Sequence, residues 1–220
     1  MKNLPPKKTR TIFLKGVKQP TLTMLKSGGN NKKLGSKVKV KMWKNMPLFS
    51  LTLEERATCP ATCEQWDNCY GNNMPFAHRY DHNHQDFLPN LENQIIQLNN
   101  KHAAGFVVRL HVLGDFYSKH YIKEWEKYLN KYSGLRAFGY THHKLLSPLG
   151  QQIHQLNTKY PDRFRVRFSD DTTVDFTAVT EKTDTGVKGI YCPEQQGKTS
   201  SCATCGYCWA SDKPVIFIEH

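Results

Sequence analysis

Cysteine placement constrains this chain more than any other feature of its sequence. All seven cysteines fall into two groups, which are widely separated along the chain. The first cysteine group is Cys59, Cys63 and Cys69, and the second cysteine group is Cys192, Cys202, Cys205 and Cys208. An odd number of cysteines at such short spacings suits metal ligation better than a disulfide framework, and free thiols of this kind belong to a reducing compartment. The sequence therefore predicts a metal-binding protein of the cytoplasm.

The first cysteine group has the spacing C-x3-C-x5-C. Three thiolates can hold three corners of a [4Fe-4S] cluster and leave the fourth iron open to a substrate or a solvent molecule. A structural zinc site usually has four ligands in close pairs. Buried unpaired thiols are the simpler alternative, but the polar neighbours Glu64 and Asp67 argue against a core environment. We therefore expect an iron–sulfur cluster at Cys59, Cys63 and Cys69.

The second cysteine group reads C-x9-C-x2-C-x2-C. Its last three members match the tight spacing of ferredoxin-type clusters better than the two separated pairs of a zinc ribbon. Gly206 lets the backbone bend closely around a cluster. Zinc is the competing metal, because thiolates suit both. The spacing leaves open whether the two groups hold separate centres or share one.

Charge divides the chain into two parts. Residues 1–46 hold 13 of the 31 Lys and Arg residues and none of the 19 acidic ones, so the rest of the chain is close to neutral. We expect a basic N-terminal arm at 1–46 and one domain at 47–220. The arm can bind nucleic acid, or it can be a solvated pair of strands at 11–17 and 37–43. No apolar run reaches the roughly 20 residues of a membrane span, so no membrane partner is expected.

Strand and helix patterns alternate along the predicted domain. The order indicates an α/β fold with a parallel sheet built from right-handed crossovers, either open or rolled into a partial barrel. Expected strands cover residues 47–53, 106–112, 135–140, 164–168, 174–179 and 214–218, and expected helices cover 75–100, 118–132 and 148–160.

Titratable residues recur where these strands end. Asp115, His142, His143 and Asp170 each follow a predicted strand. In parallel α/β folds the ligand face lies at the carboxyl ends of the strands, so these residues are the predicted catalytic groups. An aspartate after a strand is also an ordinary helix N-cap, which is the alternative for Asp115 and Asp170 individually. Their recurrence favours the functional interpretation.

Three sequence strings resemble a family of phage-encoded proteins known as the gene product eighty-eight family. They are CPATC at 59–63, VLGDF at 112–116 and CATCGYCW at 202–209. The resemblance covers about residues 46–220 and leaves the basic arm outside. It implies a viral protein that acts in the cytoplasm of an infected bacterial cell.

A more distant likeness is to radical S-adenosylmethionine enzymes, which fold as a partial (β/α) TIM-like barrel. Their three-cysteine loop follows the first strand, and a Gly-Gly-Glu type turn that binds S-adenosylmethionine ends the second. The likeness implies that Gly114 and Asp115 contact that cofactor. Two departures weigh against the radical chemistry, because the typical spacing is C-x3-C-x2-C and the turn here is reduced to Gly114-Asp115.

Three functions follow from these residues. The first is a cluster-dependent hydrolase, for example an esterase, in which an open iron acts on a small-molecule substrate while Asp115, His142 or His143 moves protons. The second is radical chemistry with S-adenosylmethionine. The third is a non-catalytic nucleic-acid-binding protein with metal-stapled loops and a basic arm. The sequence favours them in that order and predicts neither the substrate nor the oligomeric state.

Overall fold

A mostly parallel sheet forms the centre of the computed structural model, which describes residues 9–181 and 186–218. Among these residues the sheet has eight strands, and every neighbouring pair is parallel except β2 and β3. In spatial order the strands are β2 (Lys26–Ser27), β3 (Leu48–Ser50), β5 (Phe106–Leu110), β6 (Leu135–Thr141), β7 (Phe164–Ser169), β8 (Thr177–Thr180), β10 (Val215–Phe217) and β9 (Ile190–Tyr191). The predicted α/β sheet is confirmed, and it is open, with β2 and β9 at its edges.

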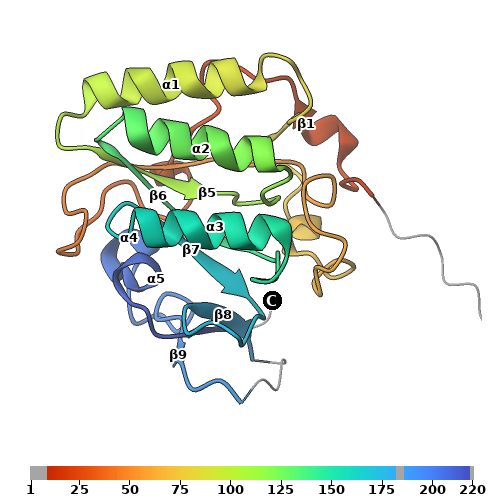
Figure 1. Cartoon of the computed structure of the whole chain (residues 1–220), viewed down its shortest axis with the longest axis vertical. Coiled ribbons are helices and arrows are strands. Elements are labelled where there is room, and N and C mark those ends of the chain that lie inside the picture. Colours follow the sequence, from red (N-terminus) through yellow and green to blue (C-terminus); the bar gives the residue numbers. More distant parts are fainter. Residues whose placement is uncertain (1–8, 182–185, 219–220) are drawn as a thin grey trace, which may run out of the picture.

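Three helices cover one face of this sheet (Figure 1). They are α1 (Phe87–Lys101), α2 (Lys119–Lys131) and α3 (Pro148–Lys159). The apolar stripe of α1, formed by Leu91, Ile95 and Leu98, is buried. Helix α2 begins where the Ser118 side chain accepts a hydrogen bond from the Tyr121 backbone N–H. Residues 75–86 precede α1 as turns that include β4 (Arg79–Tyr80), so the expected helix at 75–100 starts twelve residues late.

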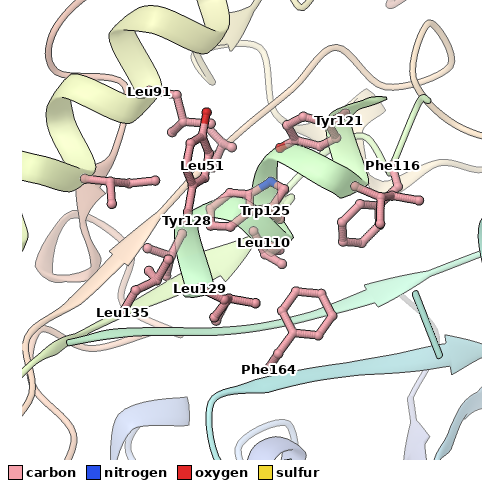
Figure 2. Packing of buried hydrophobic residues seen from close by; sticks show 14 of the residues in the cluster. Leu51, Leu91, Leu110, Phe116, Tyr121, Trp125, Tyr128, Leu129, Leu135 and Phe164 are labelled. Atoms are coloured by element: carbon pink, nitrogen blue, oxygen red, sulfur yellow. The ribbon is translucent and has the colours of Figure 1, made fainter. Parts of the chain in front are cut away.

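Figure 2 shows the core between α2 and the sheet, where Trp125, Leu129 and Leu110 meet. Trp125 and Leu129 are fully buried, as is Phe164 on β7. Each such side chain contributes about 1.5–3 kcal/mol when it leaves water. The three crossover helices are therefore held by burial of their apolar faces.

The opposite face of the sheet is covered by two segments that are far apart in sequence. One is residues 34–46, and the other contains the short helices α4 (Cys202–Cys205) and α5 (Tyr207–Ala210). The rings of Trp43 and Trp209 stack with their centroids 5.5 Å apart, and Trp209 also lies against Phe138 of β6. Gly206 separates α4 from α5 with a φ of 66°, and a Cβ there would lie 2.4 Å from Val40. The second cysteine group thus belongs to the layer that covers this face.

The expected β arm is wrong in its secondary structure. Residues 11–17 contain the 3-10 turn η1 (Leu14–Gly16), which runs into the two-residue strand β1 (Val17–Lys18), paired with β4. Residues 37–43 contribute one isolated bridge at Lys37, because the neighbouring backbone groups bond elsewhere. The N–H of Lys39 donates to the carbonyl of Ala203, 2.9 Å away. In residues 37–43 the alternation of apolar and basic residues arises because this segment packs against α4, with Val38 buried. The division between an arm at 1–46 and a domain at 47–220 stays a prediction.

One buried side chain ties the N-terminal part to α1. Gln94 accepts a hydrogen bond from the Leu25 N–H (2.7 Å) and donates one to the Leu25 carbonyl (3.1 Å). We expect Gln94→Ala to lower the free energy of unfolding by about 1–3 kcal/mol, because two buried backbone groups lose their partner. Urea unfolding measures this change. Gln97→Ala, on the exposed side of the same helix, is the matched control.

Candidate functional site

Asp115 lies at the carboxyl end of β5 and is almost fully buried. One carboxylate oxygen accepts the Phe116 N–H (2.7 Å), and the other accepts the His142 N–H (2.8 Å). Its own N–H donates to the Thr58 hydroxyl, one residue before Cys59. Burial raises the pKa of Asp115 above its ordinary value, and the nearby His143 opposes that rise. This carboxylate therefore joins the ends of β5 and β6 to the root of the first cysteine segment.

Both predicted histidines stand beside Asp115 at the end of β6. Burial lowers the pKa of His142, while the charges of Asp115 and Asp170 act against that decrease. His143 Nε2 lies 2.7 Å from the Phe116 carbonyl. A carbonyl only accepts hydrogen bonds, so Nε2 carries a proton and the neutral ring keeps its lone pair on Nδ1. Whenever this ring is neutral, the contact with Phe116 leaves Nδ1 as its proton acceptor.

Asp170 follows β7 and takes the left-handed backbone conformation, with a φ of 52°. Its carbonyl accepts a hydrogen bond from Lys144 Nζ at 2.6 Å. Lys144 also forms an ion pair with Glu64 (3.6 Å), which lies next to Cys63. This lysine therefore connects the ends of β6 and β7 with the first cysteine segment. The four predicted catalytic residues are brought to one edge of the sheet.

The first cysteine group lies over that edge, and all three thiols are free. Burial raises the pKa of Cys59, and the negative charge of Asp115 raises it further. Burial also raises the pKa of Cys63 to about 12, with Cys69, Asp115 and Asp170 adding to the rise. Cys59 and Cys63 thus both lie within electrostatic range of Asp115 and of Cys69. Within residues 9–181 and 186–218, however, no group of three or more Cys, His, Asp or Glu side chains is arranged to hold a metal ion.

Gly114 has a packing role beside its predicted place at a cofactor. Its φ is +84°, and a Cβ there would lie 2.5 Å from the Thr58 hydroxyl oxygen and 2.7 Å from Leu53 Cβ. Only glycine lets the end of β5 pass this close to the start of the cysteine segment. Whether Gly114 and Asp115 contact S-adenosylmethionine stays a prediction.

Two buried arginines brace the first cysteine segment, and sequence reasoning missed both. Arg79 forms an ion pair with Glu55 that is shielded from solvent (2.6 Å), and it also donates to the carbonyls of Gly71, Met74 and Ala77. Arg56 donates to the carbonyl of Trp66 and to the side chain of Asn72. The only signal in the sequence is the run Glu54-Glu55-Arg56 directly after an apolar strand, which by pattern reads as exposed.

The second cysteine group lies apart, on the face of the sheet opposite the three helices. The Tyr140 hydroxyl of β6 donates to Cys208 Sγ at 2.8 Å. Burial raises the pKa of Cys202 to about 12, and the neighbouring Cys208 adds to the rise. Cys192 and Cys205 raise the pKa of Cys208 in the same way. Cys208 therefore lies within electrostatic range of the other three thiols, although Cys192 follows β9 and the rest belong to α4 and α5.

His111 ends β5 as a buried and strained residue, with a φ of 52°. Its Nε2 lies 2.9 Å from the Tyr121 hydroxyl, and its Nδ1 has no hydrogen-bond partner among the described groups. Burial, together with the charge of Arg109, lowers the pKa of His111 to about 3. The folded protein therefore holds this imidazole neutral.

This imidazole makes stability depend on pH. The folded pKa lies below the unfolded one, so its contribution is complete above pH of about 6.5 and is lost as the pH falls. Between pH 7.5 and 5.5 we expect His111 to remove about 1.4 kcal/mol of unfolding free energy. Urea unfolding at the two pH values should show a smaller loss for His111→Phe than for the wild type. His120→Gln, on the exposed side of α2, should keep the full loss.

Comparison with known proteins identifies the family. No curated protein and no solved structure matches the chain. No helix within the described part of the chain is long and apolar enough to cross a membrane. A family model described as gene product 88 matches residues 22–211, which include both cysteine groups and all four strand-end residues. The match begins at residue 22, inside the basic arm, whereas the motifs indicated a resemblance that starts at about residue 46. The chain belongs to the gene product 88 family, the phage family that its cysteine motifs resemble.

Proposed function

We propose that this protein is an iron–sulfur enzyme that hydrolyses esters. Cys59, Cys63 and Cys69 would hold a [4Fe-4S] cluster at the carboxyl edge of the sheet. The observation that carries the proposal is the placement of these free thiols over Asp115 and Asp170, beside a histidine in a defined tautomer. Thiols and proton-carrying groups thus share one edge of the sheet.

The donor set fits such a cluster. Three thiolates ligate three irons and leave one iron without a protein ligand. When bound, the cluster would supply a Lewis acid at that iron. The thiols lie on a segment held by Arg56 and Arg79, whose positive charges act on Cys69 against the effect of burial. These charges favour an anionic centre, because they offset part of its negative charge.

The chain's own residues supply the proton transfers. His143 takes a proton from water at Nδ1, because its Nε2 proton is committed to the Phe116 carbonyl. Asp115, next to it, stabilises the positive charge that the imidazole gains. Burial lowers the pKa of His142, which makes this residue a poor acid, so the imidazolium formed at His143 is the candidate acid that returns the proton to the leaving group.

The strand order supports a partial TIM-like barrel as the setting for this site. Strands β3, β5, β6, β7 and β8 follow one another in space as they do in sequence, and α1, α2 and α3 cover the same face. Barrel enzymes of this kind carry their active sites at the carboxyl ends of the strands. In an infected cell the protein would work in the host cytoplasm.

Anaerobic purification of the full chain tests the proposal. We expect iron and sulfide to copurify, and we expect hydrolysis of 4-nitrophenyl esters by the loaded protein. The variant Cys59→Ser/Cys63→Ser/Cys69→Ser should lose this hydrolysis, whereas Cys202→Ser should keep the first centre. Full activity in the triple variant would exclude the cluster from the reaction. Formation of 5′-deoxyadenosine from S-adenosylmethionine by the reduced protein would favour radical chemistry instead.

Nucleic-acid binding is the second candidate, and exposed lysines favour it. Lys39, Lys41 and Lys44 are exposed on the segment that covers the second cysteine group, and none of them forms an ion pair among the described residues. Because this segment packs into the fold, charge reversal is a cleaner test than deletion. A triple Lys→Glu variant should weaken RNA or DNA binding and flatten its salt dependence. Equal affinity for the variant and the wild type would exclude this surface.

A further inference from the structure

Two arginines on neighbouring parts of the sheet lack a carboxylate partner. Arg167 of β7 is fully buried, and Arg109 of β5 is partly buried. Their strand neighbours Val108, Leu110, Val166 and Phe168 belong to the core under the helices, so both arginines project from the opposite face. Within the described part of the chain, neither guanidinium forms an ion pair.

Carbonyl groups and aromatic rings surround these two charges. Arg167 donates to five backbone carbonyls, and its guanidinium lies 4.3 Å from the Phe176 ring centre. The five carbonyls belong to Thr177, Tyr207, Cys208, Ser211 and Lys213. Arg109 lies over the ring of Tyr140, 4.5 Å from its centre. Carbonyls satisfy the donors but bring no net negative charge, and an uncompensated buried cation costs several kcal/mol.

The second cysteine group is what the two arginines face. Tyr140 pairs with Arg167 across β6 and β7, and its hydroxyl donates to Cys208 Sγ. The charge of Arg167 acts on Cys208, and that of Arg109 acts on Cys202, in both cases against the effect of burial. Two cations and one hydroxyl donor therefore converge on these thiols.

The charge of the two arginines indicates which kind of metal centre this site would bind. Four thiolates on Zn²⁺, or on a [4Fe-4S] cluster in its oxidised form, leave a net charge of about −2, which two guanidiniums would neutralise. We propose that the second cysteine group binds an anionic, thiolate-ligated metal centre of its own, with Arg109 and Arg167 as its counter-charges. The inference goes beyond the proposed hydrolysis, which concerns the first cysteine group.

The geometry also says how such a centre would form. The thiols do not form a finished metal site within the described residues. Cys192 directly follows β9, and the other three lie on two one-turn helices that meet at Gly206. Metal binding would therefore draw these segments together and stabilise the layer that covers the sheet. This layer includes Trp209 and the backbone that Arg167 holds.

The test counts metal when the first group is absent. The variant Cys59→Ser/Cys63→Ser/Cys69→Ser is purified without oxygen, and iron, zinc and sulfide are measured per chain. We expect one centre to remain, with sulfide if it is a cluster and without sulfide if it is zinc. Adding Cys202→Ser, Cys205→Ser and Cys208→Ser should remove it. A folded triple variant that holds no metal would overturn the site.

The counter-charges are tested by the rate at which EDTA removes the metal, in the wild-type and triple-variant backgrounds. Arg109→Met and Arg167→Met should each speed removal by about 10–100-fold, the usual effect of losing a residue that supports metal ligands. Arg109→Lys should stay near the wild-type rate because it keeps the charge. The matched control is Arg136→Met, since Arg136 lies at the start of β6 and donates to the carbonyls of Ser133 and Leu135, away from the second cysteine group.

Each result has a defined meaning. Wild-type removal rates in both methionine variants would overturn the role of the arginines. If Arg167→Met fails to fold, Arg109→Met alone tests the role of the counter-charges. Arg109 donates to fewer backbone carbonyls than Arg167, so its loss should disturb the fold less. If the protein proves not to hydrolyse esters, the amount of metal bound by the second cysteine group stays the same. Failure of the proposed function and failure of this site are therefore distinguishable.

Discussion

Asp115→Asn is expected to lower kcat/KM for ester hydrolysis by about 10²–10⁴-fold, the usual range for a group that supports proton transfer. The change removes the negative charge beside His143 and leaves the side chain almost the same size. An amide also offers only one acceptor oxygen for the two backbone N–H groups of Phe116 and His142. Rates over a range of 4-nitrophenyl ester concentrations measure the effect.

Asp171→Asn is the matched control for this variant. Asp171 also follows β7, and its carboxylate accepts the backbone N–H groups of Leu145 and Thr173. Its loss should cost similar stability but should leave kcat/KM within about threefold, since Asp171 is not one of the groups proposed to move protons and only such groups contribute to the proton-transfer step. Equal losses of activity in the two variants would show that Asp115 acts through the fold alone.

Arg79→Met is expected to lower the free energy of unfolding by about 3–5 kcal/mol, because it leaves the Glu55 carboxylate buried without its partner. The same change releases the carbonyls of Gly71, Met74 and Ala77, so the first cysteine segment should also loosen. Urea unfolding measures the stability, and reaction of the three thiols with a maleimide measures the loosening.

A double variant separates charge from packing at this pair. In Glu55→Gln/Arg79→Met no buried carboxylate is left, so the loss should be smaller than the sum of the two single losses. Lys159→Met removes a lysine that pairs with Glu126 at the surface, and it should leave the urea midpoint unchanged. A loss for Arg79→Met no larger than that of the surface control would contradict a buried ion pair.

Pattern reasoning located the sheet and the three helices that cover it. Residues 118–132 were expected as a helix, and α2 spans Lys119–Lys131 with Ser118 as its N-cap. This helix could be predicted because both of its signals are local: an apolar stripe with a period of 3.6 residues and a capping serine lie within one stretch of sequence. The expected strands at 11–17 and 37–43 failed because their alternation arises from contacts with distant segments.

The location of the strand-end residues could be predicted from the sequence, but their local environment could not. Asp115, His142, His143 and Asp170 were found because parallel strands place their carboxyl ends on one edge, which is a rule of topology. Their tautomers and pKa values were not predictable from the pattern. The tautomer of His143 depends on the Phe116 carbonyl, and the pKa of Asp115 depends on burial under the cysteine segment.

Arg167 is the clearest case that only the tertiary structure decided. In the sequence it alternates with Val166 and Phe168, a pattern typical of a strand with one wet face. In the fold that face is covered by α4 and α5, so the arginine is fully buried beside Cys208. The order of residues in β7 sets which side chains share a face. Whether that face is buried depends on α5, which lies about 40 positions further along the chain.

Three features could be predicted from residue patterns alone: the class of fold, the two groups of thiols and the edge of the sheet where titratable residues gather. These follow from local periodicity, from short spacings and from the direction of parallel strands. Three features depend on the tertiary fold: the first cysteine group lies over the carboxyl edge and the second on one face of the sheet, Arg79 and Glu55 pair in the interior, and two cations face the second group. Burial and charge balance depend on long-range contacts, which a pattern of neighbouring residues does not contain.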